Sequence, residues 1–138
     1  IFRVGRSRSP LPGFGSALAT AVGIDLTGYD MMALQADDLK PRTIKVVEDV
    51  HRYSCGAVSL WQMTGAGGGN VDVEFTYFPV AVDPGRPVRV IGTMMIAGDL
   101  DAFIASADEN GFFDGLAFVG MKIVEDRFID VGFGTPAS

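Results

Sequence analysis

The sequence is short of the residues that build disulfides, metal sites and nucleic-acid surfaces. It holds one cysteine, Cys55, and one histidine, His51, among 138 residues. A single cysteine excludes an intramolecular disulfide, and a metal site normally takes three or four protein ligands, so we expect neither. Lys and Arg number 11 against 17 Asp and Glu, which gives a net charge of −6. This balance argues against nucleic acid as a partner, because phosphate binding needs concentrated basic charge.

Long apolar runs are also absent. No stretch approaches 18 consecutive apolar residues, so we expect no transmembrane helix and no membrane partner. Hydrophobic residues make up 48% and charged residues 20%, which is the composition of a globular protein with a substantial core. No signal peptide is visible, and the chain begins with Ile1 rather than Met. A leader removed earlier would leave no trace, so a cytoplasmic location is expected by default.

The apolar pattern predicts one longer helix followed by three strands. Pro41 suits the first turn of a helix, and apolar residues follow it at helical spacing up to Val50. The strands are predicted at residues 57–64, 71–80 and 88–96. The connections GAGGGN at 65–70 and DPGRP at 83–87 are short, which predicts an antiparallel meander.

The ends of the chain predict further elements. Residues 1–4 favour a short strand, residues 99–110 a helix, and residues 115–134 two strands that turn around Glu125-Asp126. The fold class is therefore α+β, with helices on one face of an antiparallel sheet. We expect a core domain over 1–100 and a C-terminal helix and hairpin extension over 101–138, which packs on the core or on a dimer partner.

Three stretches in this order resemble a PAS domain. They are GIDLTGYDMMAL at 23–34, VDVEFTYFPV at 71–80 and VRVIGTMMI at 88–96. The first is similar to a PAS turn that leads into a short helix, and the others are similar to the last two PAS strands. The chain is most similar to the single-domain PAS proteins of alphaproteobacteria. RSRSPLPGFG at 6–15 departs from the PAS pattern where the first hairpin would lie.

The resemblance implies a sensory or protein-interaction module. PAS domains have a five-stranded antiparallel sheet with helices over one face. Between sheet and helices some hold haem, flavin, an organic acid or a fatty acid, and others hold nothing, so the cofactor stays open. Many PAS domains dimerise through segments that flank the core.

Apolar side chains on the predicted meander and short helix are the candidate ligand-binding residues. These residues are Met32, Leu34, Val47, Trp61, Phe75, Tyr77 and Met94. The chain has six Met, an adaptable residue that fills irregular gaps or lines tolerant pockets. Trp61 and Tyr77 would supply the few polar atoms of such a site. The alternative is that these side chains pack only against each other.

No set of residues predicts catalysis. His51 and Cys55 lie four positions apart, but no third group accompanies them. We therefore expect an ordinary histidine near the helix end and an ordinary buried or half-buried cysteine. Asp72 and Glu74 are expected to point outward from the sheet, which leaves no predicted acid or base in a pocket.

The face of the meander that points away from the core is expected to carry apolar side chains. Phe78 points outward if Tyr77 points inward, and Met63 and Ile91 do the same, depending on register. Such a surface needs a cover, either the C-terminal segment or a second chain.

These observations lead to one functional hypothesis and two alternatives. We expect a non-enzymatic sensory or signalling module that acts as a homodimer, passes a binding event to a separate signalling protein, and takes a small apolar or mixed ligand. The first alternative is a ligand-free dimerisation scaffold with a filled core. The second is a small α+β cavity enzyme with an ionisable residue in its pocket.

Overall fold

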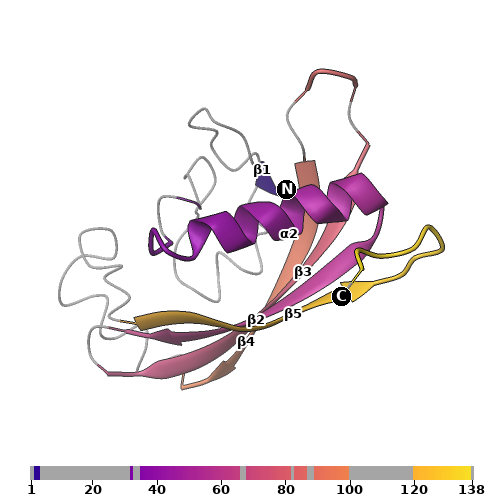
Figure 1. Ribbon diagram of the computed structural model, residues 1–138. Helices are drawn as coiled ribbons and strands as arrows, with labels where there is room; N and C mark the ends of the chain where they lie inside the picture. The colour runs from indigo at the N-terminus through magenta and orange to yellow at the C-terminus, as the bar shows by residue number, and fades with distance from the viewer. Residues whose placement is uncertain are drawn as a thin grey trace.

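The computed structural model describes residues 2–3, 32, 35–65, 68–81, 83–86, 89–99 and 120–137. These residues form an antiparallel sheet of five strands in the order β1-β4-β3-β2-β5, with one helix across one face (Figure 1). The elements are β1 (Phe2–Arg3), α2 (Lys40–Tyr53), β2 (Gly56–Thr64), β3 (Asn70–Val80), β4 (Arg89–Gly98) and β5 (Gly120–Ile129). The predicted α+β class is confirmed. In these described ranges no helix is long and apolar enough to cross a membrane.

Helix α2 forms where its sequence predicts it. Pro41 lies in the first turn, where its missing N–H costs no hydrogen bond. Val46, Val47 and Val50 fall on one stripe and are buried. The helix ends at Tyr53 and is capped by Ser54, whose left-handed backbone (φ +50°) lets the chain turn directly into β2.

The meander of β2, β3 and β4 is confirmed. Consecutive strands are antiparallel neighbours, and the buried residues of β3 alternate from Val71 to Tyr77 as predicted. The turn into β4 has Pro84 followed by Gly85 at φ +81°, and the Arg86 N–H donates to the Asp83 carbonyl at 3.0 Å. That geometry is the type II turn that a Pro-Gly pair favours.

Strand β5 corrects the prediction for the C-terminal segment. Two strands were expected to turn around Glu125-Asp126, but one strand runs through both residues and pairs with β2. The register shifts between Leu60 and Trp61, so that Val124 is the extra residue of a bulge. The bulge lets Asp126 face the helix side of the sheet, where Arg42 and Ser59 form hydrogen bonds with its carboxylate.

Other predictions fall outside the described residues. They are the helix predicted at 99–110 apart from Asp99, the first part (115–119) of the two strands predicted within 115–134, and most of the PAS-like stretch 23–34. Of the predicted strand at 1–4, Phe2–Arg3 is observed, and it pairs with β4.

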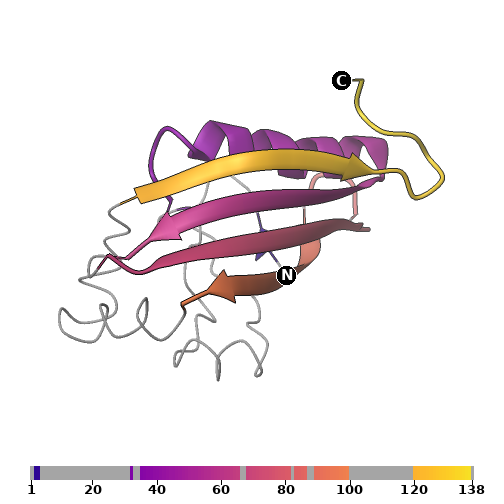
Figure 2. The same cartoon turned by 90° about the horizontal axis from the view of Figure 1, so that it is seen from below.

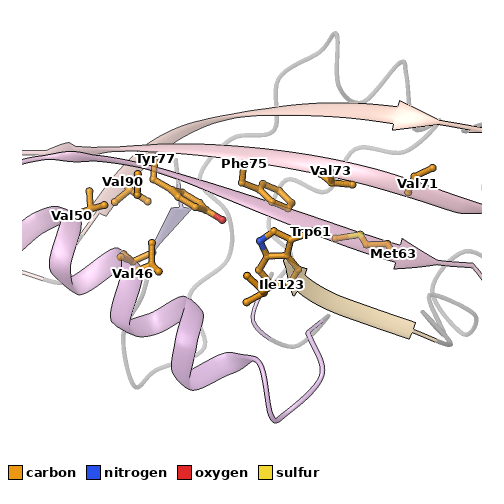
Figure 3. Close-up of a cluster of buried hydrophobic side chains, with 12 residues drawn as sticks. Val46, Val50, Trp61, Met63, Val71, Val73, Phe75, Tyr77, Val90 and Ile123 are labelled. Atoms are coloured by element: carbon orange, nitrogen blue, oxygen red, sulfur yellow. The ribbon is translucent and has the colours of Figure 1, made fainter. Parts of the chain in front are cut away.

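The core lies between the sheet and α2 (Figure 3). Its buried side chains are Val46, Val47, Val50, Ala57, Trp61, Met63, Val71, Val73, Phe75, Tyr77, Val90 and Ile123. Met63 was expected to point outward in one register. It points inward because it pairs with Val71, which is itself an inward residue. Phe78 and Ile91 point outward, as expected.

Gly98 provides a test of the β3–β4 register. Its φ is +115°, and a Cβ there would lie 2.8 Å from the Asn70 carbonyl oxygen. Gly132 has a similar φ of +108° but no atom within 4 Å of the same position. We expect Gly132→Ala to cost about 1 kcal/mol of unfolding free energy through backbone strain. Gly98→Ala should cost at least about 1 kcal/mol more, because it adds a backbone clash. Urea unfolding of both variants measures the difference, and equal losses would contradict the register.

Candidate functional site

The structure brings most of the predicted ligand-binding residues to one place. Trp61, Phe75 and Tyr77 are buried on the inner face of the sheet, which is the face toward α2, and Val47 is buried on the helix. Met94 is half-buried at the edge of this cluster, where it pairs with Phe75 across β3 and β4. Met32 is half-buried and precedes the helix, and Leu34 lies outside the described residues. Whether these side chains contact a ligand stays a prediction.

Three aromatic rings form a row across β2 and β3. Trp61 meets Phe75 edge to face, with ring centroids 5.7 Å apart and planes at 75°. Phe75 and Tyr77 stack at 6.2 Å with planes at 10°. Both arrangements suit the quadrupoles of aromatic rings. We call this row of three rings along the inner face the aromatic wall.

A chain of polar side chains crosses this apolar layer, and we call it the inner polar chain. It consists of Arg42, Asp126, Ser59 and Tyr77. The Arg42 Nε donates to Asp126 at 2.5 Å, and the Ser59 hydroxyl donates to the other Asp126 oxygen at 2.6 Å. Ser59 is also hydrogen-bonded to the Tyr77 phenol. The chain therefore connects α2 with three strands.

Tyr77 remains protonated within this chain. Burial raises the pKa of the Tyr77 phenol well above its usual range, and the negative charge of Asp126 raises it further. The hydrogen bond between Tyr77 and Ser59 lowers the pKa of the phenol but does not offset burial. Tyr77 thus presents a neutral hydroxyl to the core.

Trp61 has a buried donor that no described residue satisfies. Its side chain is 2% exposed, and its indole Nε1 has no hydrogen-bond partner among the described residues. A buried donor without a partner costs about 1–3 kcal/mol. The indole nitrogen and the Tyr77 hydroxyl turn toward each other in the space between sheet and helix (Figure 3). The Oε1 of Gln35, just before α2, is a second buried polar atom without a partner.

Sequence reasoning identified Trp61 and Tyr77 but missed the rest of the inner polar chain. Ser59 was readable, because it alternates with Ala57 and Trp61 on one face of β2. Asp126 could not be assigned to the inner face from the sequence, because strict alternation of side chains from Ile123 onward would place Glu125 there instead.

His51 and Cys55 form no site with each other. His51 lies in the last turn of α2 and is half-buried, and Cys55 is fully buried. Burial raises the pKa of the Cys55 thiol, which keeps it protonated and unreactive. Among the residues that the structure describes, no group of three or more His, Cys, Asp and Glu side chains is placed to hold a metal ion.

Comparisons with protein-family models, with curated proteins and with solved structures find no match to this chain. The resemblance to PAS domains therefore rests on the sequence stretches themselves.

The Tyr77 phenol predicts a specific loss of stability in alkali. Above about pH 10, the usual tyrosine pKa, the unfolded chain releases the proton while the folded protein retains it, so stability falls as pH rises. We expect the unfolding free energy of the wild type to fall up to about 1.4 kcal/mol per pH unit more steeply than that of Tyr77→Phe. Urea unfolding at pH 8, 10 and 11 measures the slopes.

Tyr53→Phe is the control for this experiment, since Tyr53 is half-buried at the end of α2 and outside the inner polar chain. It should retain the wild-type slope. Parallel slopes for the wild type and Tyr77→Phe would contradict a buried neutral phenol.

Proposed function

We propose that this chain is a non-enzymatic, PAS-like sensory module that binds a small molecule between the sheet and α2. It acts in the cytoplasm as a homodimer and passes the binding event to a separate signalling protein. An antiparallel sheet with a helix over one face supports this proposal, as does the order of the three PAS-like stretches.

The observation that carries the proposal is the buried indole Nε1 of Trp61, which lacks a hydrogen-bond partner in the part of the chain that the structure describes. A ligand oxygen that accepts this N–H would remove the cost of burying the donor, so the site selects a hydrogen-bond acceptor. Arg42 and Asp126 neutralise one another, which leaves no free charge within the inner polar chain to hold an ion. A ketone, amide or alcohol oxygen on an apolar body therefore suits the site better than a carboxylate.

The inner polar chain connects the proposed ligand site to helix α2. Arg42 joins α2 to β5 through Asp126, and Asp126 is joined in turn to β2 through Ser59. A ligand between the aromatic wall and α2 contacts both sides of this link. It can then favour one of two helix positions by binding one more tightly than the other.

The same contacts weigh against the enzyme alternative. Asp126 is an inward carboxylate, which such an enzyme would need, but Arg42 and Ser59 already occupy both of its oxygens. A carboxylate held in this way serves to position the helix rather than to transfer protons. The scaffold alternative is favoured by the dense aromatic packing, and the unpaired Trp61 nitrogen distinguishes the sensor from it.

The absorption spectrum and native mass of the purified protein are the first test. Extra mass of a small organic molecule is expected if the ligand copurifies. Trp61 is the only tryptophan, so a ¹H–¹⁵N spectrum contains one indole signal that reports on this site alone. Acetophenone should move that signal downfield, because its carbonyl oxygen accepts the N–H. α-Methylstyrene, which has nearly the same shape and no oxygen, should not.

Trp61→Phe separates hydrogen bonding from packing. The substitution removes the N–H while keeping an aromatic ring, and it breaks no existing hydrogen bond, so we expect the protein to fold. Calorimetry should show about a tenfold loss of affinity for acetophenone, the value of one hydrogen bond. Affinity for α-methylstyrene should stay unchanged. No binding of either probe, with no copurified mass, would leave the scaffold as the better explanation.

A further inference from the structure

The outer face of the sheet, which points away from α2, carries an exposed apolar patch. Phe78 is 38% exposed, Ile91 52% and Met95 68%. Phe78 and Ile91 are cross-strand partners, and Met95 follows on the same face of β4. Seen from this side, no described helix or strand lies over the sheet (Figure 2). Large apolar side chains exposed together on one face are typical of an interaction site.

Charged side chains on this face form no ion pair within the described part of the chain, and they follow an order along the strands. Glu125 and Arg127 lie two positions apart on β5, are both exposed, and form no ion pair with any described residue. On β3 and β4, Asp72 and Glu74 lie toward one end and Arg89 toward the other. Acidic side chains therefore lie toward one end of the face and basic side chains toward the other. Lys122 is the exception, because it lies at the acidic end.

Such an order is complementary to itself. A two-fold axis that runs across the strands lays each strand over the same strand of the other copy with its ends exchanged, so Glu125 on β5 of one copy meets Arg127 on β5 of the other. A partner of different sequence would need to supply this pattern separately, whereas a second copy of the chain already has it.

We propose that the outer face is the interface of a homodimer, with the two-fold axis crossing β5 between Glu125 and Arg127. Arg127 then meets the partner's Glu125, and Ile91 and Met95 lie over strand β4 of the partner subunit. This inference rests on the homodimer of the proposed function and names its surface. It does not depend on the ligand.

The free edge of β5 is a poor alternative interface. Among the described strands β5 has one neighbour, β2, and the bulge at Val124 interrupts its hydrogen-bonding ladder. Bulges and inward-pointing charges, here Asp126, are the features that keep an edge strand from pairing with another chain. Association through the face avoids both obstacles.

Substitutions in the apolar patch provide the first experiment. Ile91→Lys and Met95→Lys place a charge on the interface while replacing side chains that are already more than half exposed. Phe133→Lys is the matched control, because Phe133 is 77% exposed and follows the sheet rather than lying on it. Sedimentation equilibrium should show dimers for the wild type and the control. The dissociation constant should rise at least about tenfold for each patch variant, as expected for an interface anchor.

Charge reversal tests the symmetry itself. Arg127→Glu places two acidic residues opposite each other in the dimer, and Glu125→Arg places two basic ones. Each single variant should dimerise about tenfold more weakly than the wild type. The double variant should recover the wild-type dissociation constant. A mixture of the two single variants should form heterodimers in native mass spectrometry, because both opposing contacts are then of opposite charge.

Two results would overturn this interface. One is a wild-type protein that stays monomeric up to millimolar concentration. The other is a dimer that neither the patch variants nor the charge reversals weaken, which would keep the homodimer but place it on another surface. Thermal unfolding of every variant shows whether a weakened dimer reflects lost folding. Acetophenone binding is measured separately, so a failed interface and a failed ligand site are distinguishable.

Discussion

The ion pair between Arg42 and Asp126 is the interaction on which the described arrangement depends. It is the only ion pair in the described ranges that joins the helix to the sheet, since the other two, Lys40–Asp37 and Lys45–Asp49, lie within three or four residues of sequence. Apolar contacts hold α2 against the sheet without fixing its position, because hydrophobic burial is non-directional. The ion pair supplies the direction, and breaking it would leave a carboxylate that is largely buried.

The two faces of the sheet differ in the side chains that they present. The inner face combines the aromatic wall with an indole N–H that has no partner among the described residues, and the proposed small neutral ligand is inferred from that combination. The outer face carries exposed apolar side chains and charges of both signs that form no ion pair in the described ranges, and the proposed dimer interface is inferred from them. Because each strand contributes alternate residues to both faces, the two proposals imply that a shift of the sheet on ligand binding would also alter the dimer interface.

The local sequence pattern was sufficient to predict the helix α2 and the strands of the meander, but it was not sufficient to predict the inner polar chain. The helix up to Val50 and the alternation from Val71 to Tyr77 were predictable, because each follows from a short repeat of apolar residues. Asp126 was not predictable, because its direction depends on a bulge relative to β2, more than 60 residues away in sequence. The direction of Met63 likewise depended on a register that only the paired strand determines.

The bulge at Val124 has a consequence for the tendency of the protein to aggregate at high concentration. A chain without Val124 would keep Ile123 and Asp126 facing inward and Glu125 facing outward, since the residues on either side already alternate. Its edge, however, would become straight and able to pair with the same edge of another molecule, and repeated pairing of this kind builds fibrils. One inserted residue therefore distinguishes the irregular edge that β5 presents among the described strands from a straight edge that could pair with another molecule.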